Sequence, residues 1–399
     1  MMVTKSINTE TMQGAGAFNS PLAKFTSASR LYMSHNQKGQ GLDMMKPDLP
    51  RILNGFESQE RDYCIQVKAP CDLTVVQVLN KYLITPKQRA EGLVAPKVII
   101  YQSDDDGTYG YLETNQYAKY AEYFGMKYDV KPFVDRLQEN SRLAKGTVLA
   151  ECHSIIDGMY AATCNVNVAA VSTPGTIEDG YEVSESLMER MQPRVVGSKQ
   201  ARWGKSSYLV KIYGNKPFPE PGDRIREDGL LFAIRDYDPV MDSVNLLEEN
   251  ITEPDLINDK LVYATPNALV YDIDVLTTVH DNNRNGKKAI HTPEGLRDLA
   301  LQYHGKRDTF NKRLIEAIDA IPNAAYGQKL TPDLQALVTR AIADRPGDVR
   351  FPKGHDRDQG QIIRSLNAVP LEEFNVEIHY CKEFDLGLGA KISSLHGAF

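Results

Sequence analysis

Two adjacent carboxylates, Glu178 and Asp179, stand in a turn between an apolar, strand-like run at residues 166–171 and a segment that could begin a helix. A strand is therefore expected at residues 166–171. An acidic pair in a turn is most often part of a solvated surface. The pair becomes a candidate for chemistry only together with two distant stretches of the sequence.

A second candidate set lies near the start of the chain and consists of Arg30, Met33, Asn36 and Gln40. On a helix, the spacing of Met33, Asn36 and Gln40 places them on one face, with Arg30 nearby. An arginine fork suits phosphate oxygens, and the amides can bond ribose hydroxyls or base edges. The alternative is a polar surface helix whose amides contact only water. A short helix is expected near residues 27–34.

The last residues of the sequence are glycine-rich and contain Lys391 and His396. A lysine there could offset phosphate charge and help to position reacting groups. A lysine in a glycine-rich turn is more often an ordinary surface residue. Lys391 therefore becomes a candidate only through the residues that the fold places around it.

Residues 194–219 contain six basic side chains and no acidic one, and aromatic residues are interleaved with them. This composition is typical of a surface that follows a nucleic-acid backbone, which makes Arg202 and Lys205 candidates for such a contact. A solvated strand pair with ordinary lysines explains the composition equally well. The formal net charge of −7 argues against a protein that coats nucleic acid through its overall charge.

The five cysteines predict neither a disulfide framework nor a zinc site, because their number is odd and none forms a CxxC pair. Reduced thiols, and a start without an apolar signal core, favour a cytoplasmic protein. No apolar run approaches the roughly 18 residues that a membrane-spanning helix needs. No membrane contact is therefore expected.

The segments that must position these candidates are mostly β. Strands are predicted by apolar runs at residues 64–68, 72–79, 96–101, 145–151, 268–276 and 374–381. The apolar spacing changes to a helical period from residue 292 and again at residues 332–344. A mixed α+β chain that is mainly β is therefore predicted.

Two of these stretches resemble the barrel-sandwich hybrid fold. They are K-A-P-C-D-L-T-V-V-Q-V at residues 68–78 and K-G-T-V-L-A-E at residues 145–151. That fold serves lipoyl and biotinyl carrier domains and also occurs in the beta subunits of RNA polymerases. The sequence contains no E-x-M-K-M or D-K-A motif with a modifiable lysine, which disfavours a carrier domain.

The three candidate stretches resemble, in the same order, the large second subunit (beta) of multisubunit DNA-dependent RNA polymerases. The similar stretches are R-x-x-M-x-x-N-x-x-x-Q at residues 30–40, E-D with V-S-E at 178–185, and G-A-K with H-G at 389–397. The chain departs from the family pattern at Ser186 and Leu395, where the family has arginine, and at Ala390, where it has aspartate. The D-F-D-G-D metal motif belongs to the other large subunit and is absent here.

The resemblance implies a hybrid barrel plus a double-psi β-barrel, with an inserted flap domain that carries helices. The implied parts are an irregular arm at residues 1–62, the barrel-sandwich hybrid at 63–161, the first part of the double-psi β-barrel at 162–196, the flap at 197–370 (helical around 292–348), and the second barrel part at 371–399. The family's N-terminal lobes and C-terminal clamp have no counterpart. The chain is therefore expected to be a middle piece, as in the split subunits of large bacteriophages.

The implied function is DNA-directed RNA synthesis from NTPs by a subunit that is inactive alone. Arg30 and Lys391 would neutralise phosphate charge, and Glu178 with Asp179 would sit beside the second magnesium ion, which a beta-prime-like subunit mainly holds. Contacts with nucleotide or nucleic acid would come from Asn36, Gln40, His396, Arg202 and Lys205.

The expected partners are the beta-prime-like subunit, the remaining beta fragments, template DNA, product RNA and an initiation factor at the flap. The expected compartment is the cytoplasm, that of the host cell if the chain is viral. The alternative is a non-catalytic scaffold or RNA-binding assembly protein that retains the same fold. The departures at Ala390 and Leu395 favour that alternative.

Overall fold

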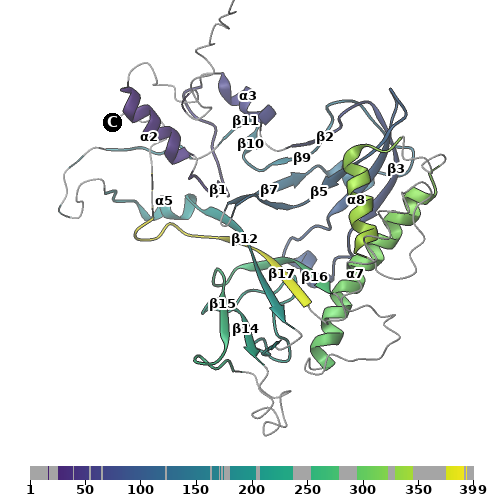
Figure 1. Ribbon diagram of the computed structural model, residues 1–399. Helices are drawn as coiled ribbons and strands as arrows, with labels where there is room; N and C mark the ends of the chain where they lie inside the picture. The colour runs from purple at the N-terminus through teal and green to yellow at the C-terminus, as the bar shows by residue number, and fades with distance from the viewer. Residues whose placement is uncertain are drawn as a thin grey trace, which may run out of the picture.

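The computed structural model is a mixed α+β protein that is mainly β, with curled antiparallel sheets and two long helices along one side (Figure 1). The structure describes residues 17, 26–38, 40–53, 55–63, 66–121, 124–161, 164–169, 171, 174, 180–203, 207–236, 253–277, 294–321, 329–344, 374–390 and 392. Among these residues, no helix is long and apolar enough to cross a membrane.

Two four-stranded sheets face each other in the first half of the chain. The first sheet has the order β5 (Tyr109–Thr114), β4 (Lys97–Ser103), β3 (Leu73–Asn80) and β8 (Arg142–Leu143). The second has the order β2 (Gln66–Lys68), β9 (Val148–Cys152), β7 (Gly125–Val130) and β6 (Tyr117–Lys119). Leu73, Ile99 and Leu149 fill the space between the sheets. Both sheets are antiparallel throughout.

Strand β4 is apolar at consecutive positions because both of its faces are buried. Ile99 and Tyr101 point into the space between the two sheets, whereas Val98 and Ile100 pack against helices on the outer face. A strand that is covered on both sides needs no polar face, which explains the continuous apolar run in the sequence.

Those helices are α7 (Glu294–Asp319) and α8 (Pro332–Ala343). Phe310, Leu314 and Ile318 follow one another at intervals of four residues on α7 and enter the same core as β3 and β4. The first turn of α8 is capped by Thr331, whose hydroxyl accepts a hydrogen bond from the Leu334 backbone N–H at 3.4 Å. The two helices therefore bury their apolar faces within this chain.

A central antiparallel sheet connects distant parts of the sequence. Its order is β1 (Asp43–Met44), β12 (Pro193–Trp203), β17 (Phe374–Glu383) and β16 (Leu269–Thr277). Strands β12 and β17 pair continuously from Arg194 opposite Glu383 to Trp203 opposite Phe374. Within this ladder Gly197 lies under the ring of Tyr380, and a Cβ at Gly197 would come within 2.7 Å of that ring.

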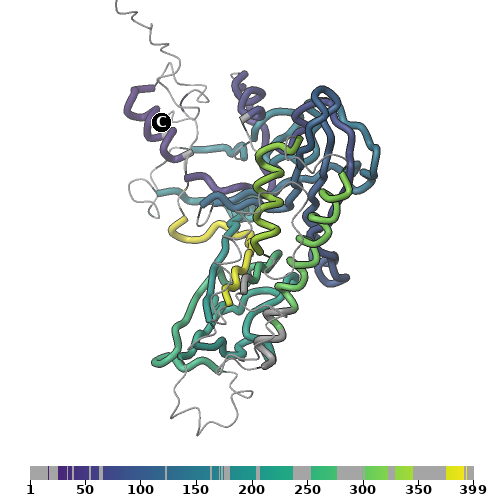
Figure 2. Tube along the Cα trace, turned by 45° about the vertical axis from the view of Figure 1, so that its right-hand side comes forward, coloured from purple at the N-terminus to yellow at the C-terminus, as the bar shows by residue number. Residues whose placement is uncertain are grey.

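One face of the central sheet packs on a smaller sheet of β13 (Ser207–Leu209), β14 (Leu230–Asp236) and β15 (Lys260–Tyr263). Trp203 and Phe374 stack at the end of the β12–β17 ladder, with ring centroids 5.2 Å apart. Helix α7 reaches from this region to the first sheet, as both Figure 1 and Figure 2 show. Its Arg307 bonds Asp274 on β16 at 3.2 Å and Asp344 at the end of α8 at 2.7 Å.

The arm, described here for residues 26–53 except 39, contains α2 (Ala28–Lys38) and β1. The remaining short elements are α3 (Phe56–Tyr63), α4 (Pro86–Ala90), η3 (Pro132–Arg136), β10 (Ile155–Ile156), β11 (Met159–Tyr160) and α5 (Glu185–Arg190). The helix expected near residues 27–34 is confirmed as α2, which extends four residues further.

One expected strand does not form. The described residues of the apolar run 166–171 have no regular structure, and Val166, Val168 and Val171 are 41%, 54% and 67% exposed. Alternating valines favour a strand only when another strand pairs with them. The described residues pair no strand with this segment, so the expectation of an apolar strand was wrong for them.

The packing of α7 on the sheet is testable through Leu314, which is fully buried between helix and strands. Leu314→Ala should lower the free energy of unfolding by about 2–5 kcal/mol, because it removes apolar contacts and leaves a cavity. Urea denaturation followed by circular dichroism would measure this. The matched control is Leu83→Ala, since Leu83 is 84% exposed. Equal effects of the two changes would show that α7 does not cover the sheet.

Candidate functional site at the junction of three chain segments

A row of three charged side chains crosses the central sheet at one end. Asp43 on β1 is the register partner of Arg194 on β12, and Arg194 is the partner of Glu383 on β17. Arg194 donates from Nη1 to Asp43 Oδ2 at 2.6 Å and from Nη2 to Glu383 Oε1 at 3.1 Å. This row is termed the junction.

The centre of the junction is buried. The side chain of Arg194 is 1% exposed and that of Asp43 is 4% exposed. Burial disfavours the charged guanidinium, but the carboxylates of Asp43 and Glu383 outweigh this effect and raise the pKa of Arg194. Asp43 also accepts hydrogen bonds from the Ser154 hydroxyl at 3.1 Å and the Lys127 backbone N–H at 3.2 Å. A buried charge with this many partners is satisfied rather than reactive.

Each strand of the junction is continuous in sequence with one of the three stretches that the sequence singled out. Helix α2 precedes Asp43, the stretch with Glu178 and Asp179 precedes Arg194, and the stretch with Lys391 follows Glu383. In Figures 1 and 2, α2, α5 and the segment after β17 lie at the same end of the molecule. The fold therefore gives these segments neighbouring points of attachment.

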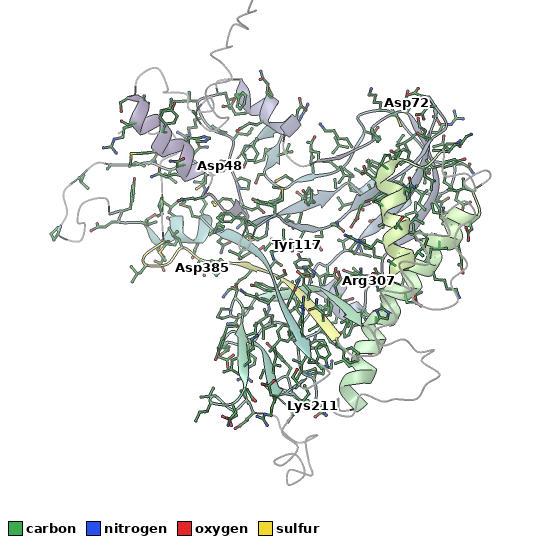
Figure 3. The ribbon with its side chains drawn as sticks, in the orientation of Figure 1. Asp48, Asp72, Tyr117, Lys211, Arg307 and Asp385 are labelled. Atoms are coloured by element: carbon green, nitrogen blue, oxygen red, sulfur yellow. The ribbon has the colours of Figure 1, made fainter. Side chains whose placement is uncertain are left out.

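A second group of hydrogen bonds extends the junction outward. Gln192 donates to Asp385 at 2.8 Å, which ties the start of β12 to the segment after β17. Arg190 at the end of α5 pairs with Asp48 of the arm, and its Nη1 donates to the Asn165 carbonyl at 3.1 Å. Figure 3 labels Asp48 and Asp385, which lie on the same side of the molecule. The segment before β12 is thus bonded both to the arm and to the segment after β17.

Asn165 is a further anchor of the arm. Its backbone N–H donates to Asp48 Oδ2 at 2.9 Å, and its side-chain amide donates to the Leu49 carbonyl at 2.7 Å. Its side-chain oxygen accepts from the Arg51 backbone N–H at 3.3 Å. These bonds hold residues 48–51 of the arm against the segment that contains Asn165.

The face predicted on α2 is exposed. Arg30, Met33 and Asn36 are exposed on the helix, and Gln40 is exposed just beyond its end. Leu31 is buried on the other side of the helix and holds it against the protein. The set is therefore accessible to a ligand or partner.

Arg202 lies at the opposite end of β12 from the junction. It is exposed and pairs in register with Asn375. Eight residues of extended strand separate it from Arg194, which corresponds to about 26 Å. The structure therefore keeps Arg202 well away from the junction.

The basic run of residues 194–219 does not form one continuous basic surface. Arg194 is buried between carboxylates, and Lys216 forms an ion pair with Glu220. Arg194 therefore contributes neither to a nucleic-acid surface nor to a solvated strand face. Its partner Asp43 is 151 residues away in sequence, and no local pattern reveals such a pair.

Five predicted site residues fall outside the described residues: Glu178, Asp179, Lys205, Lys391 and His396. Among the described residues, no three His, Cys, Asp or Glu side chains form a group that could hold a metal ion. The junction carboxylates do not supply such a site either, because Arg194 and Arg190 already occupy Asp43, Glu383 and Asp48.

The sequence analysis did not single out Asp43, Asp48, Arg190, Gln192 or Asp385. Each is an ordinary polar residue in its local context, and its importance arises only from its partner across the fold. Comparison with known proteins supplies no further guide, since neither a protein-family model nor a curated protein sequence matches the chain. A function must be inferred from the residues and the junction themselves.

Arg194→Met tests the junction. The change leaves the buried Asp43 carboxylate without its cation, so the free energy of unfolding should fall by about 3–5 kcal/mol. Arg202→Met is the matched control, because it makes the same replacement at an exposed position of the same strand and should cost less than about 0.5 kcal/mol. Urea titrations of both variants would give the comparison. Similar losses would mean that the buried pair does not hold the segments together.

Proposed function

We propose that the chain is part of the beta subunit of a DNA-directed RNA polymerase and contributes to template-directed RNA synthesis. The observation that carries the proposal is the junction. Three stretches that resemble this family, near residues 30–40, 178–185 and 389–397, are attached to neighbouring strands at one end of one sheet. The described elements next to these stretches, α2, α5 and the segment after β17, lie at the same end of the molecule.

The arrangement of the sheets gives further support. The two facing half-barrel sheets of residues 66–152 suit a barrel-sandwich hybrid. Strands β12 and β17 pair along their full length although a long insertion separates them, which suits a double-psi β-barrel interrupted by a flap. In this proposal the β13–β14–β15 sheet is the core of the flap, whereas α7 and α8 cover the hybrid barrel.

In the proposed reaction, this chain binds and orients the reactants. Arg30, exposed on α2, would bond phosphate oxygens through its planar fork, and Lys391 would add a second positive charge. Asn36 and Gln40 would contact ribose or base edges, and His396 would lie with Lys391. Magnesium, when bound mainly by a beta-prime-like subunit, would activate the RNA 3′-hydroxyl and the triphosphate, with Glu178 and Asp179 beside the second ion.

Arg202 fits a different part of the same task. Its position about 26 Å from the junction suits a contact with the nucleic-acid backbone away from the reacting atoms, together with Lys205. The remaining beta fragments, template DNA, product RNA and an initiation factor at the flap complete the proposed assembly, in the cytoplasm of a host cell if the chain is viral.

A non-catalytic scaffold is the second candidate function. It is favoured by Ala390 and Leu395, where charged residues of the family pattern are replaced. The saturated ion pairs of the junction suit a structural role equally well. The two functions differ in what Arg30 must do.

The proposal predicts that purification of the chain from its source yields a partner with a D-F-D-G-D motif. In that complex, Arg30→Ala should slow nucleotide incorporation by about 10- to 100-fold, the effect of losing a charge-assisted contact of roughly 1.5–3 kcal/mol. A primed-template extension assay would measure it. Arg89→Ala, at an exposed position on α4, is the control and should leave the rate unchanged. Unchanged elongation by an intact Arg30→Ala complex would favour the scaffold.

A further inference from the structure

His153 links the arm to the body of the protein through both of its ring nitrogens. It directly follows β9, and its Nδ1 lies 2.7 Å from Asp129 Oδ2 on β7. Its Nε2 lies 2.8 Å from the backbone carbonyl oxygen of Met45, the residue after β1. The imidazole therefore stands between an element of the core and the arm that bears α2.

The chemistry of these two contacts depends on the protonation state of the ring. A carboxylate and a carbonyl oxygen are both acceptors, so each contact needs an N–H donor on the imidazole. Neutral histidine has one donor and one acceptor nitrogen, whereas the imidazolium has two donors. Only protonated His153 can make both bonds, and the neutral ring would turn a lone pair toward one of the oxygens.

Met45 is a point at which the arm is held from two sides. Its backbone N–H donates to the Gln192 carbonyl at 3.0 Å, at the start of β12. Its carbonyl accepts from His153. Strand β1 has only two residues, so few other backbone bonds fix the arm here.

Some groups around His153 raise the pKa of its ring, and others lower it. The bond to Asp129 is the main cause of a raised pKa of His153, burial opposes it, and the bond to the Met45 carbonyl adds to it. Arg194 on β12 opposes protonation, and the pKa of Asp129 is lowered chiefly by its bond to His153. Lys127 on β7 and Asp43 on β1 are the other nearby charges, and the Arg194–Asp43 pair satisfies both of its members.

We infer that His153 is a pH-sensitive latch for the arm: its imidazolium ties Met45 to Asp129, and deprotonation breaks one of these two bonds and loosens the arm at Met45. The sign of the pH dependence follows from the raised pKa of His153 in the folded protein. The stabilisation is fully present below the ordinary histidine pKa of about 6.5. It is lost as the pH rises through the higher pKa that His153 has when both of its bonds are formed. The latch operates in the chain alone and does not require the proposed polymerase role.

Hydrogen exchange of the arm amides between pH 6 and pH 9, corrected for the intrinsic rates, tests the latch. Protection of residues 40–53 should fall with rising pH, by about tenfold for each pH unit between the latched and released pKa values of His153. In His153→Gln, an amide N–H can still reach the Met45 carbonyl without titrating, so arm protection should not change with pH. The matched control, His304→Gln on α7, should keep the pH dependence of the unmodified protein.

Nitrogen-15 shifts of histidine provide a second measurement that needs no variant at the latch itself. Both ring nitrogens of His153 should be protonated at pH 6, and Asp129→Asn should lower the midpoint of the titration. A neutral His153 at pH 6 would overturn the proposal. Arm protection that is constant with pH, or that keeps its pH dependence in His153→Gln, would overturn it as well.

Discussion

The buried contact between Arg194 and Asp43 is the interaction on which the arrangement of this chain depends. Two charges removed from water are costly unless they face each other with their remaining hydrogen bonds satisfied. Here Ser154, the Lys127 backbone and Glu383 complete that set, so one geometry is strongly preferred. That geometry fixes β1 against β12 and β12 against β17, and the three candidate segments inherit their positions from it.

The rest of the fold gives this row a rigid support. Strand β4 lies in the middle of a layered body, with another sheet on one face and two helices on the other. Helix α7 then reaches from that body to β16, where Arg307 bonds Asp274. The central sheet is therefore held from several sides. In the proposed role, this chain contributes only part of a site. Such rigidity would hold its site residues in a fixed position relative to the partner subunits.

Regular elements were predictable because their causes are local. The four-residue apolar spacing of α7 and the continuous run of β4 reflect burial patterns that any window of sequence reveals. The junction was not predictable, because Arg194 looks like one more basic residue until Asp43 is placed beside it. The valines at residues 166–171 misled for the same reason. Their strand propensity is real, but pairing depends on a neighbouring strand, and the described residues provide none.

The ladder of β12 and β17 closes a very long excursion of the chain. The ten-residue pairing from Arg194 to Trp203 brings the chain back to its starting point. Within the excursion, β16 joins the same sheet, and α7 and α8 pack on β3 and β4, so these three elements are bound to the rest of the fold. Doubling the length of a flexible loop costs only about 0.6 kcal/mol in closure entropy. The connections between these three elements are therefore where evolution can lengthen or trim the excursion while the charged row at the base of the ladder stays intact.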